Sequence, residues 1–355
     1  MPLLALWLSL ALADDPPADP AAAPAEPASM EAPEAPPPAE APAEAPAEAP
    51  AEAPAEAPAE TPELGPDGLP AWYPRYEKAK PPPTHRLWYR SSTFARINPL
   101  GLQSILDIGW RYQLIKRVGT FYNDSYVFIG PTVNASPSFV RGGVKVEAMP
   151  ISVLRFHAAY QGIVYTGAFD NLTSFPSLNS DFSDNAMAEA ADAYVTTGGV
   201  FNLGWRVQLK IAAFAFRNTS EIAYWHLNLR DGDVAFYEQF WDRMIGNNTL
   251  AVQNDLDIMG APGRARIGVR YTYSDTLLGD DSLADTRNHR LGPLFAFEFH
   301  DRKPGARFNH PSLFVLAQWW LQHEYRTGQQ QPWGLPLIAV GLTFDGDLIG
   351  ERPPR

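Results

Sequence analysis

Charged side chains recur at every second position along several apolar stretches of this chain. Between residues 203 and 215 every odd residue is apolar, while Arg206 and Lys210 stand at even positions. When charged side chains line a pore they sort solutes by charge, and elsewhere they neutralise one another in ion pairs. Both roles remain open for this polar set, which we expect to line a lumen: Asp107, Arg111, Lys145, Glu147, Arg155, His157, Arg206, Lys210, Asp255, Asp257, Arg264, Arg266, Arg270 and Glu298.

One cross-strand pairing can be predicted from a turn through residues 259–262. If Ile258 lies opposite Gly263, Asp257 faces Arg264 and Asp255 faces Arg266 on the same inner face. Solvated pairs of this kind contribute roughly 0.2–1 kcal/mol each.

Metal and cofactor sites are not expected. The chain has no cysteine, which excludes disulfides and thiolate zinc sites. Acidic residues gather around positions 275–285, where carboxylates could bind calcium, but the spacing differs from an EF-hand and favours a solvated acidic loop. His323 and Glu324 are adjacent and would point to opposite faces of a strand, so they predict no shared metal.

The elements that position these residues must be β-strands, because the apolar period is two. In 102–114 the even positions carry mostly apolar residues and the odd positions mostly polar ones. Side chains of a strand alternate between two faces, so each segment has one apolar and one polar face. A soluble sandwich would bury the apolar face, whereas a transmembrane barrel would turn it toward lipid.

Segment length and aromatic residues favour the transmembrane barrel. The segments run about 10–13 residues, close to the roughly 9–11 needed for a tilted span. Aromatic residues such as Trp110, Tyr160 and Trp319 end the apolar faces, as at a membrane interface. We predict a single antiparallel all-β barrel of about 14 strands, with 12 as the alternative: 87–97, 102–115, 124–134, 138–148, 151–165, 191–201, 203–217, 220–230, 233–243, 249–259, 263–275, 288–300, 312–323 and 335–344.

Over residues 87–344 this pattern resembles the outer-membrane β-barrel proteins of Gram-negative bacteria. The last predicted strand, 335–344, is similar to the C-terminal assembly signal of that class, with Gly341 and the closing Phe344. The resemblance is one of architecture and names no specific family. It implies a porin-like barrel in the bacterial outer membrane with both termini in the periplasm.

An enzymatic role is not expected. The segment Tyr224–Asn228 is superficially similar to the histidine strand of outer-membrane phospholipases, but Asn228 stands where the serine nucleophile belongs. A serine hydrolase needs that hydroxyl beside its histidine base. We therefore predict no catalytic residue and place His226 on the polar, lumen-facing side.

The chain outside the barrel has a different composition. Residues 1–13 are typical of a signal peptide, with an apolar run ending in Ala11-Leu12-Ala13. Residues 14–70 contain 14 of the 40 acidic residues, 17 of the 35 prolines and no Lys or Arg, which predicts a disordered, extended acidic tether. Residues 71–86 form an aromatic and proline-rich linker or plug, and 345–355 a C-terminal tail.

The remaining 26 acidic residues nearly balance the 28 basic ones, so nucleic acid is not an expected partner. We expect a passive pore or small-solute channel with a charged lumen. The alternative is a non-transporting structural barrel with a filled lumen, whose outer loops or acidic tether contact partners. The expected partners are outer-membrane lipid and, through 14–70, a periplasmic or cell-wall component.

Overall fold

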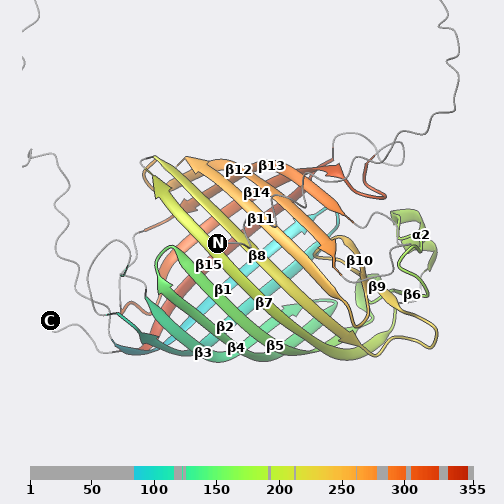
Figure 1. Ribbon diagram of the computed structural model, residues 1–355, viewed down its shortest axis with the longest axis horizontal. Helices are drawn as coiled ribbons and strands as arrows, with labels where there is room; N and C mark the ends of the chain where they lie inside the picture. Colours follow the sequence, from blue (N-terminus) through green and yellow to red (C-terminus); the bar gives the residue numbers. More distant parts are fainter. Residues whose placement is uncertain are drawn as a thin grey trace, which may run out of the picture. The chain divides into compact units, whose positions relative to one another are not determined.

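Twelve antiparallel strands close into a barrel (Figure 1). The computed structural model describes residues 84–115, 122, 125–190, 193–211, 213–260, 262–277, 287–300, 305–327 and 335–350, all within the unit Pro74–Arg355. The barrel strands are β1 (His85–Ile97), β2 (Gly101–Gln113), β3 (Tyr126–Ser136), β4 (Phe139–Ile151), β5 (Leu154–Thr166), β7 (Val195–Ile211), β8 (Phe214–Leu227), β11 (Leu250–Gly260), β12 (Ala265–Thr276), β13 (Asn288–Glu298), β14 (Asn309–Gln322) and β15 (Leu337–Gly350).

Pairing of the first strand with the last closes the barrel. Each strand pairs with its neighbour along the chain, and β1 pairs with both β2 and β15. Closure leaves no unpaired strand edge, which a lipid environment requires because the bilayer core offers no hydrogen-bonding partner. β15 continues past Phe344 to Gly350, so part of the expected C-terminal tail is barrel strand.

The prediction of 14 strands was wrong by two. Asn202, expected as a turn, lies inside β7, which joins the predicted strands 191–201 and 203–217. The predicted strand 233–243 does not enter the barrel wall. It contributes instead to the short strands β9 (Ala235–Glu238) and β10 (Arg243–Gly246), which form a separate sheet with β6 (Ser174–Phe175). The alternation of apolar and polar residues indicates that a segment is a strand, but it does not indicate which other strand the segment pairs with.

Long connections gather at one end of the barrel. The connections 167–194, 228–249, 277–287 and 323–336 join strands at this end, and they carry a short 3₁₀ helix (Ala168–Asp170), β6, β9, β10 and α2 (Asp184–Ala190) (Figure 1). At the other end, where β1 begins and β15 ends, most turns are short, although 114–125 and 299–308 are longer. Among the described residues no helix has the length and apolar character needed to cross a membrane.

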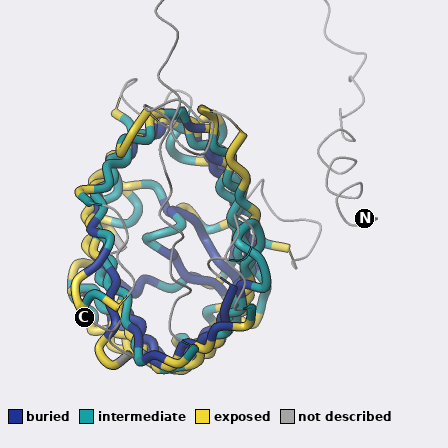
Figure 2. Tube along the Cα trace, turned by 90° about the vertical axis from the view of Figure 1, so that its left-hand side faces the viewer, coloured by how far each residue is buried: buried dark blue, intermediate teal, exposed yellow. Residues whose placement is uncertain are grey.

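Apolar side chains face outward and most charged side chains face the lumen. Leu209 and Ile211 are 45% and 57% exposed on the outer surface, whereas Asp107 and Arg111 are 2% and 4% exposed. In Figure 2 the barrel forms a closed ring, and the positions coloured as exposed lie along its outer side. A barrel that faced water would hide these apolar residues, so the distribution is that of a membrane barrel.

Two placements inferred from the sequence were wrong. His226 lies on the exposed outer face of β8, where its Nδ1 lies 2.6 Å from Oδ1 of Asn248, because the inward residues of this strand are its odd ones, including the buried Trp225. The β11–β12 turn spans residues 261–264, so Asp257 pairs with Arg270 and not Arg264, and Asp255 pairs with Thr272 and not Arg266.

The predicted signal peptide and tether lie outside the described residues, as do positions 71–83 of the linker. The predicted end of the linker at residue 86 was too late, because β1 begins at His85 and His85 and Arg86 already belong to the barrel wall.

Candidate functional site

A hairpin folds inward across the lumen at the end that carries the long connections. It comprises β9, β10 and the turn between them, residues 235–246, which we call the lumen hairpin. Figure 2 shows described segments crossing the interior of the ring. Every residue of β9 and β10 is buried. A connection of this length would otherwise expose Phe236 and Ile245 to water, and burying them against the barrel interior is favourable.

Polar contacts fix one side of the lumen hairpin to β1 and β4. Nη2 of Arg141 donates to Oε1 of Glu238 at 3.0 Å, and both side chains are more than 90% buried. Nη1 of Arg96 donates to the carbonyl of Phe240 at 2.8 Å, and its Nη2 donates to the carbonyl of Gln239. These contacts join the hairpin to the barrel wall, and they provide hydrogen bonds to backbone oxygens of the turn.

Asp242 anchors the other side of the hairpin. Its carboxylate accepts hydrogen bonds from Tyr237 at 2.6 Å, from Nε1 of Trp320 at 3.1 Å and from Nε of Arg326 at 2.8 Å. Nε2 of His323 lies 2.9 Å from the Asp242 carbonyl. Burial raises the pKa of Asp242, but His323 and Arg326 outweigh it and lower this pKa to about 2. The anchor therefore carries its negative charge throughout the physiological pH range.

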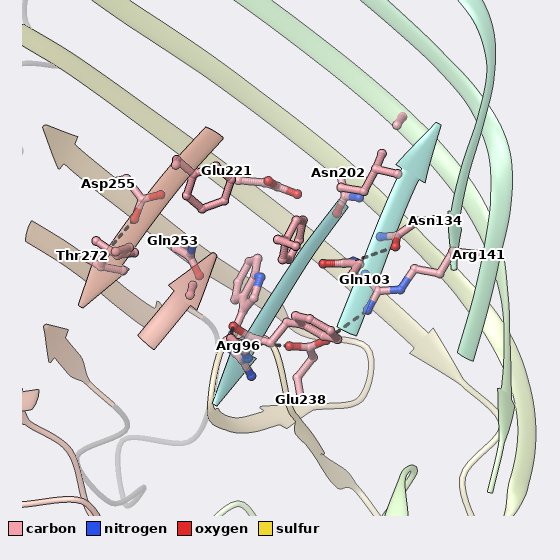
Figure 3. A pocket seen from close by; sticks show the side chains of 18 of the residues that line it. Arg96, Gln103, Asn134, Arg141, Asn202, Glu221, Glu238, Gln253, Asp255 and Thr272 are labelled. Carbon is pink, nitrogen blue, oxygen red and sulfur yellow. Dashed lines mark hydrogen bonds and ion pairs between the residues drawn. The ribbon is translucent and has the colours of Figure 1, made fainter. Parts of the chain in front are cut away.

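Beneath the hairpin the lumen holds a cavity of about 420 Å³. Residues of the strands around the whole barrel line it, together with Glu238, Phe240 and Trp241 of the hairpin. In Figure 3, Glu221, Gln253 and Asn202 lie around this space on the neighbouring strands β8, β11 and β7, and Gln103 lies on β2. This space has room for a small solute.

A network of ion pairs runs from the cavity toward the end where β1 begins. Asp107 accepts from Nη2 of Arg90 and Nζ of Lys145, both at 2.9 Å. Glu147, which is 1% exposed, lies 3.2 Å from Arg90 and 3.7 Å from Arg155. Arg90, Lys145 and Arg155 thus face two carboxylates, Asp107 and Glu147, so this network holds one more positive than negative charge.

A second group of charges lies on β8, β11 and β12. Nε of Arg270 donates to Oδ1 of Asp257 at 2.7 Å, and its Nη1 lies 3.5 Å from Asp255. Nε of Arg217 donates to Oδ2 of Asp257, also at 2.7 Å. One buried carboxylate thus holds two guanidinium groups, on the strands to either side of β11.

The sequence-predicted set divides into three groups. Asp107, Lys145, His157, Asp255 and Arg270 line the cavity. A second group lies on strands that line the cavity, but its own side chains do not: Arg111, Glu147, Arg155, Arg206 and Asp257. The Arg111 guanidinium lies 3.5 Å from the Tyr126 ring centre, and Arg206 donates to Thr219 at 3.2 Å.

The third group lies near the end where β1 begins. Arg264 donates to the carbonyl of Phe299 at 2.9 Å, and Arg266 pairs with Glu298 at 3.4 Å. Lys210 is exposed beside the β7–β8 turn.

Sequence reasoning missed several charged residues of the cavity. Glu221 and Arg290 stand at inward positions of β8 and β13, and Arg96 at an inward position of β1. The alternation of apolar and polar residues on β8 and β13 could have identified Glu221 and Arg290 as inward residues. On β1 the alternation is weak, so Arg96 was harder to identify. Glu238 had no such signal, because its place in the lumen depends on where the hairpin folds.

Basic side chains outnumber acidic ones in this part of the lumen. Glu221, Arg206 and Arg290 have no ion pair within the described part of the chain. Among the residues that line the cavity, the Lys and Arg side chains are Arg96, Arg141, Lys145, Arg270 and Arg290, and the Asp and Glu side chains are Asp107, Glu221, Glu238 and Asp255, which makes five basic and four acidic. In general, an excess of basic side chains along a pore favours anions.

No protein-family model matches the chain, and no curated protein matches it. Solved structures to which it is similar include the β domain of the Bordetella autotransporter BrkA, with 9% identity over 74% of this chain and 99% of that chain and a TM-score of 0.36. The outer membrane protein Omp33 of Acinetobacter baumannii is 9% identical over 76% and 100%, with a TM-score of 0.32. The outer membrane protein OmpT of Vibrio cholerae is 6% identical over 74% and 98%, with a TM-score of 0.30.

Like these proteins, the chain has the architecture of an outer-membrane β-barrel. That assignment rests on the closed strand order and the apolar outer face of this chain.

Proposed function

We propose that the protein is a passive pore of the bacterial outer membrane that passes small solutes and prefers anions. The observation that carries this proposal is the cavity beneath the lumen hairpin, in a lumen where basic side chains exceed acidic ones. A filled barrel would leave no such space, and a balanced lumen would give no preference. The proposal assigns no catalytic residue and no cofactor.

The orientation follows from the connections. Outer-membrane barrels have short periplasmic turns and longer extracellular loops. The long connections and the lumen hairpin would then lie at the outer mouth, and both termini in the periplasm. The acidic residues 14–70 would contact a periplasmic or cell-wall component.

Reconstitution in a planar lipid bilayer tests the pore. With a KCl gradient across the membrane, we expect steady channels whose reversal potential has the sign of chloride preference. Absence of current across pH and salt would refute the pore, and a potassium preference would refute the charge argument.

The hairpin's buried anchors favour a second candidate, a closed barrel that contacts partners without transport. A variant in which a short Gly-Ser link replaces residues 235–246 separates the two. If the intact protein is silent and this variant conducts, the natural barrel is closed. If both conduct, with larger current in the variant, the hairpin is a constriction in an open pore.

A further inference from the structure

The cavity wall is polar over most of its circumference but carries apolar side chains on β14 and β15 and at Phe94 of β1. Leu294 pairs with Leu316, and Leu316 with Ala339, across neighbouring strands. With Leu337 and Met259 these residues form a cluster in which each is at most 8% exposed. Phe94, Phe314 and Phe240 extend the apolar surface along the cavity. Water-filled pores have polar interiors, so this sector is unusual for a simple aqueous channel.

Arg290 borders this apolar sector. It lies on β13 beside Trp320 of β14, and Leu294 follows it on the same inward face. Its side chain lines the cavity, and the residue is 4% exposed. No hydrogen bond or ion pair reaches it from the described residues, and its buried Nε is unsatisfied. Leaving a buried guanidinium unpaired is costly, so a partner from solution would be favourable.

The nearby acids are already engaged. Asp242 accepts from Tyr237, Trp320 and Arg326, and Asp255 accepts from Thr272 at 2.7 Å and lies 3.5 Å from Arg270. On the far side of the sector Arg96 adds a second positive charge beside Ala339, with two of its nitrogens donating to hairpin carbonyls.

We infer that the cavity binds small monocarboxylates with an apolar body, such as an aromatic ring or a branched chain. The carboxylate accepts hydrogen bonds from the Arg290 guanidinium, whose planar fork matches it. The apolar body lies on Leu316, Leu337 and Phe314. The inference deepens the proposed function, because a bound solute of this class is the natural cargo of the pore.

Binding to the purified, full-length protein in detergent tests the site without requiring transport. Titration calorimetry compares benzoate with benzamide, which has the same ring and no charge, and with acetate, which has the charge and no ring. We expect benzoate to bind at least about tenfold more tightly than either. Equal binding of benzoate and benzamide would overturn the role of Arg290, and equal binding of benzoate and acetate would overturn the role of the apolar sector.

Variants assign the two parts separately. Arg290→Gln should weaken benzoate binding about tenfold or more and leave benzamide unchanged, whereas Leu316→Ser should weaken both and leave acetate unchanged. Arg264→Gln removes an arginine outside the cavity and serves as the matched control. Unchanged benzoate affinity in Arg290→Gln would refute the assignment. If that variant does not fold, Arg290→Lys, which keeps the charge but loses the planar fork, should weaken benzoate binding less than tenfold.

Bilayer recordings separate this inference from the proposed function. Benzoate, but not benzamide, should interrupt the chloride current. A protein that binds benzoate and carries no current would refute the pore and leave the site intact. A chloride channel in which benzoate and benzamide bind equally would refute the site and leave the pore.

Discussion

Glu238 and Arg141 form a buried ion pair of 3.0 Å that joins the lumen hairpin to strand β4. Arg141 also stacks on Phe139 and Trp225, with its guanidinium 4.3 Å and 4.6 Å from the ring centres. The pair is therefore enclosed between the hairpin and the wall, and the position of the hairpin depends on it.

Removing one charge of this pair should release the hairpin. Glu238→Gln leaves the Arg141 guanidinium buried without a counter-charge, which costs about 3–5 kcal/mol. The chain has no cysteine, so Ala235→Cys, at a residue with 0% exposure, gives a single labelling site. We expect maleimide to modify it at least about tenfold faster in the Glu238→Gln background, because modification requires local opening. Equal rates in the two backgrounds would contradict this role.

Acid should loosen the same hairpin through Asp242. Its pKa of about 2 is below the ordinary value near 3.8, so its stabilising contribution is complete above about pH 4 and disappears as the pH falls toward 2. We expect bilayer conductance to be constant from pH 7 to 4 and to rise below that. The Asp242→Asn variant should conduct more at neutral pH, and the rise in conductance that protonation of Asp242 causes below pH 4 should be missing. An identical acid response in the variant would assign the effect to other carboxylates.

Ion selectivity should follow the charges of the lumen. Replacing both Arg155 and Arg206 with Gln should lower the chloride-to-potassium permeability ratio, whereas Glu221→Gln should raise it. Lys210→Gln, at an exposed position beside the β7–β8 turn, should change it little. Reversal potentials in a KCl gradient provide the measurement, and changes of the same sign in Arg155→Gln/Arg206→Gln and Glu221→Gln would argue against electrostatic selection.

Asp257 should contribute more to stability than the more exposed Glu298. It is 1% exposed and binds both Arg217 and Arg270 at 2.7 Å. Asp257→Asn leaves two guanidinium groups short of a counter-charge, at a cost of roughly 3–5 kcal/mol. Glu298→Gln removes the more exposed pair with Arg266 and should cost at most about 1 kcal/mol. Urea unfolding in lipid vesicles measures both, and similar losses would refute the difference.

The outward direction of the apolar face can be tested on adjacent residues of β7. Leu203 is 44% exposed on the outer surface and Asn202 lines the cavity. Leu203→Arg should destabilise the barrel in vesicles by about 2–4 kcal/mol, because its charge would lie in hydrocarbon. Asn202→Arg should be tolerated. The opposite ranking would mean that the apolar face is not the lipid face.

The sequence by itself determined which face of each strand is apolar. Because side chains alternate along a strand, Leu209 and Ile211 had to share one face and Arg206 the other. The same local rule placed Asp107 and Lys145 on inward faces, and the length of the segments indicated a membrane span. These features depend on residues one or two positions apart.

Only the tertiary structure decided which strands pair, in what register, and what fills the lumen. Asp257 meets Arg270 because the β11–β12 turn lies at residues 261–264. The alternation of apolar and polar residues on the two strands does not reveal where that turn lies. Glu238 reaches Arg141 because a connection folds inward, and Arg290 makes no ion pair with the described residues although its side chain is buried. These outcomes depend on contacts between residues tens of positions apart, about which a local period carries no information.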